Sequence, residues 1–73
     1  MTTLSPEIMR RITAMQYGEA TEHIIYQRLA RVTTDSHNRD ILTRIADDEK
    51  RHCEFWREIT GRDVRPGRLR ALL

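Results

Sequence analysis

The chain has 73 residues, of which 13 are basic and 11 acidic, so its formal net charge is +2 at neutral pH. A chain this short forms one domain at most, and its core rarely supplies more than about 3–5 kcal/mol without a staple or oligomerisation. Cys53 is the only cysteine, which excludes an intrachain disulfide and favours a reducing, cytoplasmic location. No apolar run approaches the ~20 residues that a membrane-spanning helix needs.

The first predicted element is a helix over about residues 5–33. Ser5 is a typical N-cap, Pro6 suits the first helical position, and Glu7 lies near the positive end of the helix dipole. After this start, apolar residues recur at intervals of three and four and form one stripe: Ile8, Ile12, Met15, Tyr26, Leu29 and Ala30. Glu19 and Glu22 fall inside the same stripe.

The second predicted element is a helix over about residues 36–60. The polar segment 33–36 separates it from the first helix, Asp35 or Ser36 can cap it, and Gly61 ends it. Its stripe contains Ile41 or Leu42, Ile45, Trp56 and Ile59, with Glu49 and His52 in the middle. Since no strand-like alternation occurs, we predict an all-α antiparallel helical hairpin, in one domain spanning residues 1–73.

A basic tail, residues 61–73, follows the second helix and can begin another helix at Pro66. It contains four arginines, Arg62, Arg65, Arg68 and Arg70, against Asp63 alone. Basic tails can bind nucleic acid or an anionic membrane. No reading motif and no aromatic stacking platform accompanies this one, so we expect a solubilising role and no nucleic-acid partner.

Glu19, Glu49 and His52 are the candidate functional residues, because they interrupt apolar stripes. Ionised groups that face a core are costly unless they are paired or bind a metal. Glu49 and His52 are three residues apart and share one face of a helix. With the turn near residues 34–36 and a rise of about 1.5 Å per residue, Glu19 lies at nearly the same height as Glu49. The three side chains should therefore face one another.

A single hairpin leaves the far side of its apolar stripe uncovered. A second copy packed across a two-fold axis would cover it and form a four-helix bundle. The dimer would then gather four glutamates and two histidines, whose four negative charges match two divalent cations. Carboxylate and imidazole ligands together suit iron or manganese. We predict two iron ions per homodimer, with manganese or another divalent metal as the alternative.

The residues named above resemble those of the ferritin-like superfamily, and in particular its rubrerythrin branch. The likeness rests on Glu19 followed by Tyr26, on the 30-residue interval from Glu19 to Glu49, and on the DDEKRH segment that ends at His52. It covers about residues 12–66. Within the superfamily the chain is most similar to the encapsulated ferritins and to the rubrerythrin-like domain of vacuolar-iron-transporter-type proteins, which the TGRDV segment also resembles.

This resemblance implies a di-iron site that oxidises ferrous iron for storage or detoxification. It also implies that Tyr26 hydrogen-bonds near the metal, and that the partner is an encapsulin shell or the membrane domain of an iron transporter. The chain would then act inside such a shell or at the cytoplasmic face of a membrane. Rubrerythrins carry two Glu-x-x-His motifs per chain and this sequence has one, so a complete site requires a homodimer or a higher homo-oligomer. The Cys-x-x-Cys pairs of a rubredoxin-type centre are absent from the sequence.

Several alternatives stay open at this stage. The domain can sense iron without turnover, reduce peroxide, or act as a metal-free helical dimerisation module, and Glu49 and His52 can be a solvent-facing pair. Glu22 is either a further ligand, an entry-site carboxylate or a surface acid, and Tyr26 is either core or close to the metal. The remaining polar and apolar candidates are expected to be structural: His23 exposed, His37 in the interhelix break or first turn, Cys53 a small buried side chain, and Met15, Ile45 and Trp56 in the core.

Overall fold

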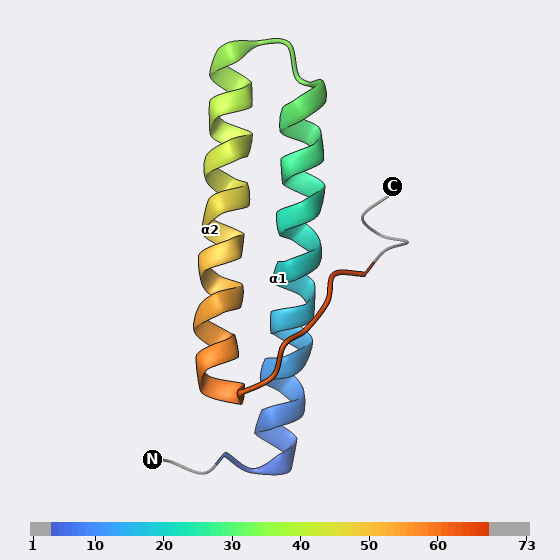
Figure 1. Ribbon diagram of the computed structural model, residues 1–73, viewed down its shortest axis with the longest axis vertical. Helices are drawn as coiled ribbons and strands as arrows, with labels where there is room; N and C mark the ends of the chain where they lie inside the picture. Colours follow the sequence, from blue (N-terminus) through green and yellow to red (C-terminus); the bar gives the residue numbers. More distant parts are fainter. Residues whose placement is uncertain (1–3, 68–73) are drawn as a thin grey trace.

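The chain folds into two antiparallel helices in this computed structural model, which describes residues 4–67. Helix α1 spans Pro6–Val32 and helix α2 spans Ser36–Thr60, and a three-residue linker joins them. The helices lie side by side, and the first turns of α1 extend beyond the end of α2 (Figure 1). Among the described residues there is no strand, so the predicted all-helical hairpin is confirmed. No helix within residues 4–67 is long and apolar enough to cross a membrane.

Local capping interactions define where each helix begins and ends. The Ser5 hydroxyl accepts a hydrogen bond from the Ile8 amide at 3.2 Å. Of the two residues that could cap α2, Asp35 is the N-cap, and its Oδ2 accepts from the Asn38 amide at 2.8 Å. Gly61 ends α2 with φ +67°, a left-handed conformation that favours glycine. The start and stop signals of both helices could thus be predicted from local sequence.

The seam between the two helices is built from small and polar side chains. Its buried apolar residues are Ala20, Ala30 and Ala46, and its buried polar residues are Gln16 and Thr21. Small side chains let two helices approach closely, so the larger apolar residues are left beside the seam. The hairpin consequently has little core of its own, as expected for a chain of this length.

Large apolar side chains lie instead on an uncovered face of the hairpin. Six of them are 41–55% exposed: Ile8, Met15, Leu29, Ile41, Phe55 and Ile59. The prediction that Met15 lies in a core is wrong for the single chain, because Met15 is 48% exposed. Ile45 and Trp56 are only half-buried. The physical reason is that one hairpin has a single seam, which the alanines already fill.

Residues 61–67 fold back along α1 and close the open end of the hairpin (Figure 1). The buried Gln16 side chain donates through Nε2 to the Arg62 carbonyl at 2.6 Å and accepts from the Thr60 hydroxyl at 3.0 Å. Further along, the Gly67 amide donates to Thr21 Oγ1 at 2.7 Å. The described part of the tail contains no helix, and the helix predicted from Pro66 falls mostly outside the described residues.

Candidate metal centre

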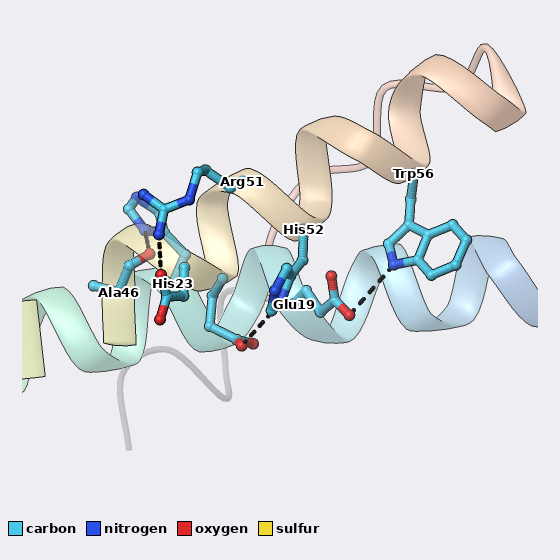
Figure 2. Close-up of polar contacts among 8 residues, drawn as sticks. Glu19, His23, Ala46, Arg51, His52 and Trp56 are labelled. Carbon is cyan, nitrogen blue, oxygen red and sulfur yellow. Dashed lines mark hydrogen bonds and ion pairs between the residues drawn. The ribbon is translucent and has the colours of Figure 1, made fainter. Parts of the chain in front are cut away.

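The candidate ligands come from the middle of both helices. Helix α1 contributes Glu19 and Glu22, and α2 contributes Glu49 and His52. The His52 ring nitrogen Nδ1 lies 3.6 Å from Glu49 Oε1, which is the contact expected for a pair three residues apart (Figure 2). The Glu49 carboxyl group also interacts electrostatically with Glu19 and Glu22 across the seam. The structure therefore brings three carboxylates and one imidazole to the same level of the hairpin.

Glu49 is the most perturbed residue of this group. Its side chain is 16% exposed, whereas that of His52 is 57% exposed. A hydrogen bond with Glu22, followed by burial and by the negative charges of Glu22 and Glu19, raises the pKa of Glu49 to about 7, against a smaller opposing effect of His52. Without a cation, Glu49 thus tends to keep its proton. Glu49 is therefore not a solvent-facing residue, whereas its neighbour His52 is largely exposed.

One oxygen on each of two facing carboxylates lacks a hydrogen-bond donor. Oε2 of Glu19 and Oε2 of Glu49 are both shielded from solvent, and neither accepts a hydrogen bond from any described residue. Buried carboxylate oxygens without donors are costly and rare. A bound cation is one way to satisfy such oxygens, so the chemistry of these two carboxylates is compatible with the metal suggested by the sequence.

The other oxygen of Glu19 is held by a tryptophan. Trp56 on α2 donates through Nε1 to Oε1 of Glu19 at 3.4 Å (Figure 2). Trp56 also packs edge-on against Phe55, with ring centroids 5.1 Å apart. Beside them an open depression of about 310 Å³ is lined by Glu19, His52, Phe55 and Trp56. The carboxylate is therefore oriented by the indole and reachable from the uncovered face.

The ligand set of a single chain is incomplete. Within residues 4–67, no three His, Cys, Asp or Glu side chains converge closely enough to hold a metal ion. The Tyr26 side chain is half-buried, and no hydrogen bond of its hydroxyl group is found among the described residues. The metal-proximal role that the family resemblance implies for Tyr26 stays a prediction.

Two histidines and the cysteine lie outside the ligand set. The prediction of an exposed His23 is wrong: the side chain is half-buried, and its Nδ1 lies 2.7 Å from the Ala46 carbonyl, to which it donates. His37 is exposed in the first turn of α2. Cys53 is half-buried, and burial together with the charge of Glu19 raises the pKa of its thiol. A protonated thiol is a poor metal ligand and a poor nucleophile.

Sequence reasoning missed the contacts made by Trp56 and His23. Each depends on the rotation of one helix against the other, which spacing along a single helix does not determine.

Comparison of the chain with protein-family models, with characterised proteins and with solved structures gives no match.

Proposed function

We propose that the chain is a half-site for iron oxidation: two copies form a ferritin-like four-helix bundle, and the bundle binds and oxidises ferrous iron between them. The observation that carries this proposal is the pair of buried oxygens, Glu19 Oε2 and Glu49 Oε2, which have no hydrogen-bond donor among the described residues. They come from different helices, and one of them belongs to the Glu49 carboxyl group, whose pKa is raised to about 7. Carboxylates in this state are poised to exchange a proton for a cation.

The uncovered apolar face supports the proposed dimer. On α1, Ile8, Met15 and Leu29 follow one another at intervals of seven, and Glu22 occupies the remaining position of that row. On α2, Ile45, His52 and Ile59 form a matching row. A monomeric protein rarely exposes a continuous apolar face, because covering it stabilises the fold. A second copy would cover the face and bring its own Glu19, Glu22, Glu49 and His52 against the first set.

Each residue has a distinct role in this proposal. Glu19 and Glu49 supply oxygen ligands from opposite sides of the seam, and His52 supplies a neutral nitrogen ligand. Trp56 holds one oxygen of Glu19 and so leaves the other free to bind. Glu22, as the hydrogen-bond partner that raises the pKa of Glu49, is close enough to become a further ligand. Ferrous iron is the substrate in this proposal. Two ferrous ions bound close together can each give an electron to dioxygen, so the electrons come from the substrate and not from the protein.

The proposal is tested by titrating ferrous iron anaerobically into the chelator-treated protein and then admitting oxygen. We expect saturation at two ions per dimer, followed by rapid oxygen uptake and ferric absorbance. Sedimentation before and after the titration should show that iron favours the dimer, since ligands from two chains bind one metal pair. The same experiment with peroxide in place of oxygen, and with an added electron donor, tests whether the protein reduces peroxide instead.

The controls separate the remaining functions. Glu54 and Glu58 are exposed acids on α2 outside the site, and replacing either with alanine should leave binding and oxidation unchanged. Stoichiometric binding without oxygen uptake would instead favour an iron-sensing domain. A protein that binds no iron, and dimerises equally well with and without chelator, would contradict the proposal and favour a metal-free dimerisation module.

A further inference from the structure

A second cluster of polar residues lies near the linker and shares no residue with the carboxylate cluster. An open cavity of about 240 Å³ is found there. Its polar lining comes from both helices and consists of His23, Gln27, Arg31, Arg39, Thr43 and Asp47. The buried residues Ala30 and Ala46 also line it. None of the four candidate metal ligands contributes to this cavity, so it is a separate feature of the hairpin.

The two arginines give the cavity its charge. Arg31 lies in the last turn of α1 and Arg39 in the first turns of α2, so the short linker brings them to one end of the hairpin. Neither guanidinium group has an ion pair or a hydrogen bond with another described residue. Guanidinium groups present several donors in a planar fork that matches the oxygens of an oxyanion. Two such groups facing one cavity can bind a single anion together.

The cavity is also held in shape. His23 donates through Nδ1 to the Ala46 carbonyl at 2.7 Å, which fixes the imidazole of α1 against the backbone of α2 at the cavity wall (Figure 2). Asp35, as the N-cap of α2, fixes the start of the helix that carries Arg39. A volume of about 240 Å³ lies below the roughly 300–1,000 Å³ of sites for drug-sized ligands, so the cavity suits a small ion.

Asp47 decides which anion fits. Its carboxylate is unfavourable for an anion that only accepts hydrogen bonds, such as sulfate. Hydrogen phosphate keeps one P–OH group at neutral pH, and this group can donate to a carboxylate while the other oxygens accept from arginine. Sulfate has no such proton, and neither has the dianion of a phosphate monoester. The Asp47 carboxylate would be left without a donor beside such an anion. This should disfavour sulfate and phosphate monoesters relative to hydrogen phosphate.

We propose that this cavity is a binding site for free hydrogen phosphate, with Arg31 and Arg39 as the donors and Asp47 as the acceptor of the phosphate proton. The site is independent of the proposed iron centre, because the two share no residue. Gln27 and Thr43 add neutral hydrogen-bonding groups at its rim. It would let the protein respond to the phosphate concentration of its surroundings.

The test uses the full chain, freed of metal with a chelator, at constant ionic strength. Inorganic phosphate, sulfate and adenosine monophosphate are titrated separately by calorimetry, and amide chemical shifts locate the binding. We expect saturable binding of phosphate at one site per chain, with shifts at residues near the linker, and binding of sulfate and of the monophosphate weaker by about tenfold or more. Equal binding of all three anions, or no saturable binding, would overturn the proposal.

Charge-matched variants complete the experiment. Arg31→Gln and Arg39→Gln should each weaken phosphate binding by about tenfold or more, whereas Arg44→Gln, an exposed arginine that does not line the cavity, should not. Asp47→Asn should strengthen sulfate binding and reduce the preference for phosphate. Equal weakening by Arg44→Gln would show non-specific attraction and refute the site. Glu49→Ala should leave phosphate binding intact, so failure of the iron proposal is distinguishable from failure of this one.

Discussion

The indole N–H of Trp56 donates to Oε1 of Glu19 across the seam at 3.4 Å, while Oε2 of the same carboxylate has no donor among the described residues. One side chain of α2 thereby fixes a carboxylate of α1 in a defined orientation. Residues that hold a metal ligand in this way typically change metal affinity or activity about 10–100-fold when replaced. This relationship gives the first prediction.

Replacing Trp56 with phenylalanine should weaken iron binding or slow oxidation by about tenfold while the fold is kept. Phenylalanine retains an aromatic ring against Phe55 but lacks the N–H donor, so Glu19 loses its anchor. The measurements are the ferrous titration, the rate of oxygen uptake and the circular dichroism spectrum. Tyr17→Phe, which alters an exposed aromatic residue of α1 outside the candidate site, is the control. Unchanged iron affinity and rate in Trp56→Phe would mean that the indole has no positioning role.

Glu49→Ala should abolish iron binding and leave the apo-protein as stable as the wild type or more stable. The variant removes two central carboxylates per dimer and relieves the repulsion that raises the pKa of Glu49. Thermal melts of apo and iron-treated protein, with iron counted by elemental analysis, measure both effects. Glu54→Ala, an exposed acid five residues along α2, is the matched control. A Glu49→Ala protein that keeps its full iron content would remove Glu49 from the site.

The stability of the apo-protein should fall as the pH rises from about 4.5 to about 7. The native state holds the Glu49 proton with a pKa of about 7, whereas in the unfolded chain the carboxyl group has its ordinary pKa of 4.5, so the native state binds more protons between these values. The resulting destabilisation is absent below the lower pKa and complete above the upper one, on the order of 3 kcal/mol. Iron binding should strengthen over the same interval, because the metal displaces the proton.

The pH effect is isolated by comparing wild type with Glu49→Gln in urea denaturation. The amide mimics the protonated carboxyl group, so the two proteins should have similar unfolding free energies near pH 4.5, and the variant should be the more stable above pH 7. Parallel pH profiles of wild type and variant would show that Glu49 does not titrate as described.

Charged substitutions on the uncovered face should dissociate the dimer. Met15→Glu or Phe55→Glu places a carboxylate where the proposed second copy packs, and an unpaired charge buried in an interface costs several kcal/mol. Sedimentation at micromolar concentration should then show monomer. Val32 is 76% exposed but does not belong to the row of Ile8, Met15 and Leu29, so Val32→Glu is the control. Equal sedimentation of all three variants and the wild type would place the interface elsewhere.

Gln16→Met should release the tail from α1. Methionine preserves the volume of the fully buried glutamine but removes its hydrogen bonds with Arg62 and Thr60, at a cost of about 1–3 kcal/mol. Limited trypsin digestion should cut after Arg62 faster in the variant than in the wild type. Gln27→Met changes an exposed glutamine of the same helix and should leave the cleavage rate unaltered.

Local sequence predicted much of this architecture. The serine, aspartate and glycine caps act through groups within four residues, so Ser5, Asp35 and Gly61 were recognisable without any tertiary information. Likewise, a three-residue interval was enough to pair Glu49 with His52 on one face. The assembly of two hairpins and the identity of the metal stay predictions.

The unpredicted features depend on contacts between distant segments. The hydrogen bond between Gln16 and Arg62 joins residues 46 positions apart, and the bond between Trp56 and Glu19 joins residues 37 apart. Hydrophobic periodicity identified an apolar stripe correctly but not which part of it faces the second helix. Alanines took that position, and residues such as Met15 remained outside.

The tail has a mechanical consequence for the carboxylate cluster. The hairpin is tied at one end by the linker and at the other by Gln16 and its partners, and Glu19 and Glu49 lie between these two ties. Helices joined at one end only could lean apart and let water reach the repelling charges. Helices tied at both ends keep the carboxylates close together. Their repulsion therefore persists until a proton or a cation neutralises it.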